Sequence, residues 1–156
     1  MNGVSKLTVT EDVALVTFNK LPADHKLIAG ILDEFSKAEM NIDMISQTTS
    51  QGGDISFSFT VSGSDMVKAL SLLKKMKEEG LEVKPLVSSG NTKIQLYGEE
   101  MREMYGVAAR AIDVVARTGV QVVIITTSEV DISMLCASSH VDECIEELEK
   151  AFGLNA

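Results

Sequence analysis

The stretch VQVVIITTSEVDISML, residues 120–135, repeats a pattern that already occurs at 45–57 as ISQTTSQGGDISF. In each copy Thr-Thr-Ser is followed, after a short gap, by Asp-Ile-Ser. The two triplets begin at Thr48 and Thr126, one in each half of the chain. Internal similarity at such a distance predicts two structural units of similar fold.

The segments around each copy follow the same order of periodicities. The first half predicts a strand at 13–18, a helix at 22–40, hairpin strands at 41–50 and 54–63, a helix at 64–80 and a strand at 81–87. The second half predicts a strand at 92–98, a helix at 104–117, hairpin strands at 120–128 and 130–136, and a helix at 139–152. The order is therefore β-α-β-β-α-β in the first half, and the second half lacks its last strand.

Apolar side chains at helical spacing define the inward faces of these helices. In the first half they are Leu27, Ile28, Ile31, Leu32, Phe35 and Ala38, followed by Met66, Leu70, Leu73 and Met76. In the second half they are Val107, Ala108, Ala111, Val114 and Val115, followed by Val141, Cys144, Ile145 and Leu148.

An unused extended run near the N-terminus, SKLTVT at 5–10, can supply the missing strand. Because an unpaired sheet edge is a liability, we expect residues 4–10 to cross over and complete the second unit. The resulting fold class is α+β: two ferredoxin-like units, each an antiparallel sheet with helices on one face. The expected domains are 11–89, and 90–156 together with 3–10.

Composition limits the classes of partner. The chain has 156 residues, of which 45% are hydrophobic, and a formal net charge of −9. Such a chain can bury a core, but it would repel the phosphates of nucleic acid and of anionic membranes, so neither is an expected partner. The N-terminus lacks the features of a signal peptide, and the two cysteines form no disulfide framework. The sequence therefore predicts a reduced cytoplasmic protein.

Catalytic and metal sites find little support. His140 and Cys144 lie at i and i+4 of one predicted helix, and Cys136 precedes them, but the other histidine, His25, is in the opposite half. A structural zinc site needs four ligands, and Cys144 falls on the apolar face of its helix. No nucleophile elbow, P-loop or dinucleotide fingerprint occurs. We expect no metal, no cofactor and no catalytic residue.

A small ligand is better supported, at two strand-to-helix segments. Residues 19–26 and 98–106 each lead from a strand into a helix, where free N–H groups and the positive helix end suit a carboxylate. Opposite them we expect the hairpin-strand starts at 41–43 and 121–123, whose backbone can hold an amino group. The combination predicts an amino-acid site, although ordinary turns explain such segments more often.

At these residues the sequence resembles a known family. The segments AEMNIDMISQTTS (38–50), DISFSFTVSGSDMVKALSLLKKM (54–76) and GVAARAIDVVARTGVQVVIITTSEVDISML (106–135) are similar to the paired ACT domains of aspartate kinase. The resemblance covers residues 10–153. It implies a regulatory module that binds lysine or threonine as a feedback inhibitor and associates through its sheets, as a homodimer.

The resemblance also implies which residues bind the effector. They are Lys26, Ile28, Asn41, Ile42, Asp43 and Gln47 in the first unit, and Gln121, Val122, Ser128 and Glu129 in the second. Backbone groups at 42 and 122 would hold the main-chain charges of the amino acid, and Glu129 or Asp43 could pair with a lysine ammonium.

The chain departs from the family at three places. Lys26 stands where the family has a glycine, Gln121 replaces an asparagine, and the second strand-to-helix segment keeps only Met101 and Gly106 of the family pattern. An alternative reading is therefore a free-standing ACT assembly module with degenerate pockets. The kinase domain that binds ATP and aspartate is absent from this sequence. The chain fits an excised piece, a separate regulatory subunit or a free-standing protein, and its partner would be an aspartate kinase catalytic chain or domain.

Overall fold

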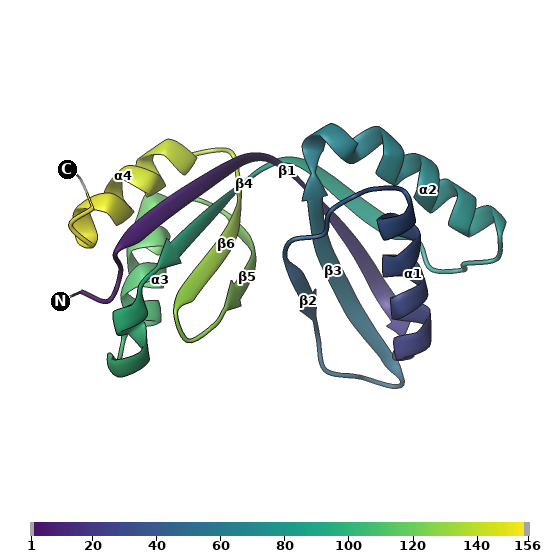
Figure 1. The fold of residues 1–156 in the computed structure, drawn as a ribbon, viewed down its shortest axis with the longest axis horizontal. Helices are drawn as coiled ribbons and strands as arrows, with labels where there is room; N and C mark the ends of the chain where they lie inside the picture. Colours follow the sequence, from purple (N-terminus) through teal and green to yellow (C-terminus); the bar gives the residue numbers. More distant parts are fainter. Residues whose placement is uncertain (1, 155–156) are drawn as a thin grey trace. The chain divides into compact units, whose positions relative to one another are not determined.

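The computed structural model describes residues 2–154, which contain four α-helices and six strands. Figure 1 shows their arrangement. In chain order they are β1 (Lys6–Pro22), α1 (His25–Lys37), β2 (Ile45–Gln47), β3 (Asp54–Ser62), α2 (Met66–Glu78), β4 (Pro85–Tyr97), α3 (Val107–Thr118), β5 (Val122–Thr127), β6 (Asp131–Ala137) and α4 (Val141–Ala151). Short 3-10 helices at Gly63–Asp65 and Glu99–Glu103 precede α2 and α3.

The chain forms two compact units. The N-terminal unit is Asp12–Gly90, and the C-terminal unit combines Met1–Glu11 with Asn91–Ala156. The long strands β1 and β4 contribute residues to both units. The sequence predicted separate strands at 5–10 and 13–18, and again at 81–87 and 92–98. In the structure β1 joins the first pair, and β4 joins residues 85–87 to the strand at 92–98, whereas residues 81–84 form no strand. Only single residues with positive φ, Asp12 (55°) and Gly90 (71°), mark the two boundaries, and no turn intervenes.

Strand order confirms the predicted α+β architecture. Hydrogen bonds link the strands in the order β2-β3-β1-β4-β6-β5. The N-terminal unit uses β2-β3-β1-β4 and the C-terminal unit uses β1-β4-β6-β5, so both units have the same order once β1 is counted as the last strand of the second. In each unit two helices pack on one face of the strands (Figure 1).

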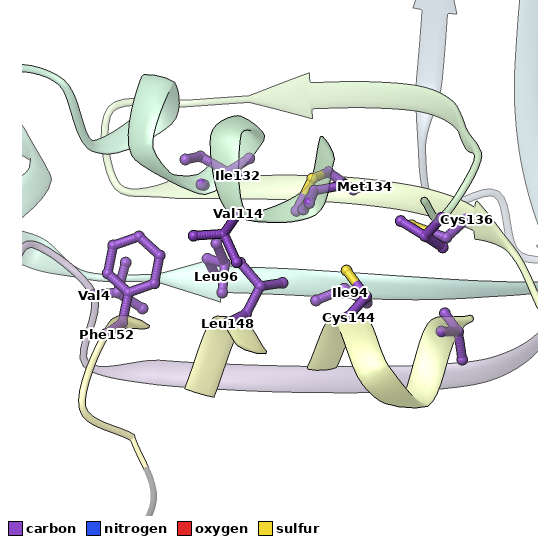
Figure 2. Packing of buried hydrophobic residues seen from close by; sticks show 14 of the residues in the cluster. Val4, Ile94, Leu96, Val114, Ile132, Met134, Cys136, Cys144, Leu148 and Phe152 are labelled. Atoms are coloured by element: carbon purple, nitrogen blue, oxygen red, sulfur yellow. The ribbon is translucent and has the colours of Figure 1, made fainter. Parts of the chain in front are cut away.

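The N-terminal residues complete the C-terminal unit, as the missing strand predicted. The amide of Ser5 donates to the carbonyl of Tyr97 at 2.8 Å. Val4 is only 4% exposed and belongs to the same core cluster as Phe152, and both residues are labelled in Figure 2. The Asn2 side chain donates to the Phe152 carbonyl and accepts from the Val4 amide. Side-chain burial and backbone pairing therefore both hold the leading strand in place.

Aromatic rings fill the core of the N-terminal unit. Phe59 of β3 is fully buried, and its ring centroid lies 4.9 Å from that of Phe35 on α1, in an edge-to-face arrangement. The rings of Phe57 and Phe18 lie 5.8 and 6.4 Å from it. Because Ile55, Phe57, Phe59 and Val61 alternate along the strand, β3 presents all four to the helices, as the period-two pattern predicted.

Two helix residues that the sequence predicted to face the core are exposed in the structure. Leu70 is 48% exposed on α2, whose buried residues are Ala69, Leu73 and Met76. Ala108 is exposed on α3, which begins at Val107 rather than at 104. The later start has a local reason, since Gly106 at the N-cap has φ = 83°, outside the helical region. None of the helices within residues 2–154 is long and apolar enough to span a membrane.

The first hairpin is less regular than predicted. Of residues 41–50, only Ile45–Gln47 forms a strand. The Met44 amide donates to the Thr60 hydroxyl at 2.9 Å, and the Asp43 amide donates to the Thr60 carbonyl at 3.2 Å. One residue of β3 thus satisfies two successive amides, which interrupts the regular ladder before β2 begins.

Candidate functional site

The start of α1 holds Lys26 and Ile28. Asp24 caps this helix, because its side chain accepts a 2.9 Å hydrogen bond from the Lys26 amide. The Lys26 residue is exposed, whereas Ile28 is 6% exposed and packs in the core. The capping carboxylate therefore already satisfies one of the amides that the sequence assigned to a ligand.

The hairpin residues Asn41, Ile42 and Asp43 lie at the other end of the N-terminal unit. They follow α1, and the Asp43 amide donates to the Thr60 carbonyl, whereas Pro22, just before α1, pairs with Asp54. Thr60 and Asp54 are six positions apart on one strand, or roughly 20 Å. The structure thus does not bring Lys26 together with Asn41–Asp43 within this unit. Gln47 is exposed and pairs with Phe57, between the two ends.

The C-terminal unit divides its candidates in the same way. Val122 begins β5, and Gln121 directly precedes it; the Gln121 carbonyl accepts from the Ala137 amide at 3.0 Å. Ser128 and Glu129 lie in the turn between β5 and β6, at the opposite end of these strands. That turn adjoins the 98–106 segment, because the Gly98 amide donates to the Val130 carbonyl at 2.8 Å. The structure therefore joins Ser128 and Glu129, but not Gln121 and Val122, to the predicted carboxylate-binding segment.

Asp131 organises the turn. Its carboxylate accepts from the Ser128 hydroxyl at 2.6 Å and from the Gln95 amide nitrogen Nε2 at 2.8 Å. The Ser128 hydroxyl oxygen also accepts from the Val130 amide. The hydrogen bond from Ser128, helped by Gln95 and by the charge of Lys93, lowers the pKa of Asp131. Ser128 is therefore engaged within the turn, and Asp131 carries a negative charge.

A second group of charges adjoins the turn. Arg102 Nη1 donates to Glu129 Oε2 at 2.6 Å, and Arg102 Nε donates to Glu99 Oε2 at 3.2 Å. The Tyr97 hydroxyl donates to Glu99 Oε1 at 2.5 Å. The hydrogen bonds from Tyr97 and Arg102 lower the pKa of Glu99, and the hydrogen bond to Glu99 raises the pKa of Tyr97. Sequence reasoning missed this group of side chains, because no periodicity links Arg102 to Glu129 across 27 positions.

A groove of about 420 Å³ lies at the corresponding hairpin end of the N-terminal unit. Its lining consists of Lys20, Thr48, Thr49, Gln51, Asp54, Ile55 and Ser56. Lys20 has φ = 55°, an uncommon conformation for a residue with a side chain. It lies where the β1–β3 register shifts, between Phe18 and Leu21. Hydroxyl, amide and charged groups therefore line this groove.

Among residues 2–154 no group of three or more His, Cys, Asp or Glu side chains is placed to hold a metal ion. His140 is exposed at the N-cap of α4, whereas Cys136 and Cys144 are buried in the core of the C-terminal unit (Figure 2). Burial raises the pKa of both thiols, that of Cys136 to about 12. Reactive cysteines need a thiolate, so these two are structural.

The buried Cys136 thiol predicts a loss of stability at alkaline pH. Above about pH 8.5 the unfolded state releases the thiol proton while the folded state keeps it, so stability falls as pH rises toward the folded pKa. Between pH 8 and 10 the protein should lose roughly 1–2 kcal/mol more than Cys136→Ala in urea unfolding. Equal losses in both proteins would show that Cys136 does not carry the effect.

Sequence comparisons relate the chain to the ACT domain family and to aspartokinases. The ACT domain family matches residues 27–76 and 94–152. Aspartokinase of Pseudomonas aeruginosa is 27% identical over 153 residues, which cover 98% of this chain and 37% of that protein. Aspartokinase of Corynebacterium efficiens is 32% identical over 143 residues, which cover 90% of this chain and 34% of that protein. The chain thus spans little more than a third of the length of these relatives.

Solved structures share the whole fold. The ligand-free regulatory subunit of aspartate kinase from Thermus thermophilus matches with a TM-score of 0.87 at 22% identity, over 96% of this chain and 99% of that one. A chain in the crystal structure of aspartokinase alpha and beta subunits matches with a TM-score of 0.83 at 26% identity, over 96% and 99% of the two chains. The chain belongs to the ACT domain family, and its tandem architecture is that of the regulatory region of aspartate kinase.

Proposed function

We propose that this chain is a non-catalytic regulatory module that binds lysine or threonine and controls an aspartate kinase catalytic chain or domain by feedback inhibition. The observation that carries the proposal is the N-terminal strand, which gives the chain two complete ACT units within its own length. The structural match covers 99% of the regulatory subunit of aspartate kinase from Thermus thermophilus. The proposed limits of the two domains are 11–89, and 90–156 with 3–10.

The division of the candidate residues supports a homodimer. In each unit one set lies at the helix-start end, with Lys26 or Glu129, and the other at the start of the hairpin, with Asn41 or Gln121. A small amino acid cannot reach both ends of one unit. We therefore place the effector where units from two copies of the chain meet, each supplying one end. Binding there would favour one arrangement of the copies, and this difference in affinity is what a catalytic partner would sense.

Calorimetry tests the ligand. We expect lysine or threonine to bind with a Kd of about 1 mM or tighter, the affinity that a few charge-assisted hydrogen bonds support in an exposed site. Each of the remaining amino acids should be titrated in the same way, at neutral pH. No heat of binding from any of the twenty would remove the sensing function and leave the fold unaffected.

A second candidate function is an assembly module whose pockets no longer bind. It is favoured by the pairing of Glu129 with Arg102 and of Ser128 with Asp131, since both candidate side chains already have partners within the unit. The same titration, run beside analytical ultracentrifugation, separates the two functions. Dimers that form without any amino-acid binding would support assembly alone.

A further inference from the structure

The turn that contains Glu129 has a cation of its own. The Arg102 guanidinium bridges Glu129 at 2.6 Å and Glu99 at 3.2 Å, and so ties the 3-10 helix Glu99–Glu103 to the β5–β6 turn. An arginine that donates to two carboxylates in fixed directions is held more firmly than a single ion pair. The Tyr97 hydroxyl fixes the other oxygen of Glu99. The bridge therefore has a defined geometry although its members are exposed.

The other charged groups that contact this turn are mostly negative. Glu99, Glu129 and Asp131 face the turn, and hydrogen bonds lower the pKa of Glu99 and of Asp131. Lys93 adds a positive charge near Asp131. Arg102 is the cation that contacts Glu129. Without it, Glu129 would offer a carboxylate to the positive side chain of any ligand bound beside the turn.

The two repeats differ at this point. In the N-terminal unit the corresponding hairpin end is a groove of about 420 Å³, with Lys20, Thr48 and Asp54 in its lining. In the C-terminal unit the side chains of Arg102 and Glu129 meet at the turn. A single chain thus presents an open polar groove in one repeat and an internally paired turn in the other.

We propose that Arg102 is a specificity-determining residue, a built-in counter-ion that occupies the place of a ligand ammonium at Glu129, so that this end of the C-terminal unit prefers neutral over cationic amino acids. This inference rests on the proposed function, since it concerns the same effector site. A diamino acid must displace the guanidinium or bind beside it against like charge. A neutral side chain of the same length meets neither cost, and the ion pair between Arg102 and Glu129 can remain intact while it binds.

Titration of four proteins with two ligands tests this role. L-Lysine and L-norleucine differ chiefly in the terminal group, which is an ammonium in one and a methyl in the other. The proteins are the wild type, Arg102→Gln, the double variant Arg102→Gln/Glu129→Gln, and the control Arg117→Gln. Arg117 forms an exposed ion pair with Asp113 at 2.8 Å on α3, so its removal also deletes one arginine from a surface pair.

The wild type should bind norleucine at least as tightly as lysine. Arg102→Gln should strengthen lysine binding about three- to fivefold, the upper part of the range that one exposed ion pair supports, and change norleucine binding by less than about twofold. The double variant should lose this gain, and Arg117→Gln should keep the wild-type ratio. An unchanged lysine-to-norleucine ratio in Arg102→Gln would overturn the inference alone. Absence of binding in all four proteins, to these ligands and to threonine, would overturn the proposed function with it.

Discussion

Gly98→Ala should destabilise the C-terminal unit by about 3 kcal/mol, because the added methyl group meets backbone rather than a movable side chain. A Cβ at Gly98 would overlap the carbonyl oxygen of Gly3 and lie 3.0 Å from the Cα of Val4. The leading strand would have to move away. The unit would then lose the Ser5–Tyr97 hydrogen bond and the buried Val4 side chain. Urea unfolding measures the loss, and amide exchange of Ser5 locates it.

Gly30→Ala is the matched control for Gly98→Ala. Gly30 lies in α1, and a Cβ there meets nothing within 4 Å. Alanine is the better helix former, so this variant should be more stable than the wild type by up to about 1 kcal/mol. A Gly98→Ala protein with wild-type stability and a protected Ser5 amide would show that the strand is not held by close backbone approach.

The topology could be predicted because local patterns determine it. The repeat at Thr48 and Thr126, the two periodicities and the missing last strand together indicated two units and a strand supplied by the N-terminus, and the structure confirms both. The need for glycine at position 98 could not be predicted in this way. Its reason is the proximity of Gly3, which is distant in sequence and gives no local signal.

The candidate site shows where such patterns stop being informative. The element order of the repeat already implies that the start of α1 and the start of the hairpin lie at opposite ends of a unit, since the helix reverses the chain direction between them. The amino-acid site predicted between residues 19–26 and 41–43 of one unit ignored that reversal. The Arg102–Glu129 pair is a different case. Exposed charged residues follow no periodicity, so only the three-dimensional structure could show that these two side chains form an ion pair.

Phe59→Ala should have a comparably large effect in the other unit, with a loss of about 3–5 kcal/mol. The ring is fully buried and contacts aromatic rings from three elements: Phe18 of β1, Phe57 of β3 and Phe35 of α1. Removing it leaves a cavity whose walls belong to separate strands and a helix. Such walls cannot close without breaking the β1–β3 pairing at Val16 and Phe59, so most of the cavity should persist.

Two variants separate this cavity effect from a general sensitivity of the unit. Phe59→Leu keeps most of the side-chain volume and should lose clearly less stability than Phe59→Ala in urea unfolding. Leu70→Ala removes an apolar side chain that is 48% exposed on α2, and should cost less than about 1 kcal/mol. Equal losses for Phe59→Ala and Leu70→Ala would contradict a core built around the Phe59 ring.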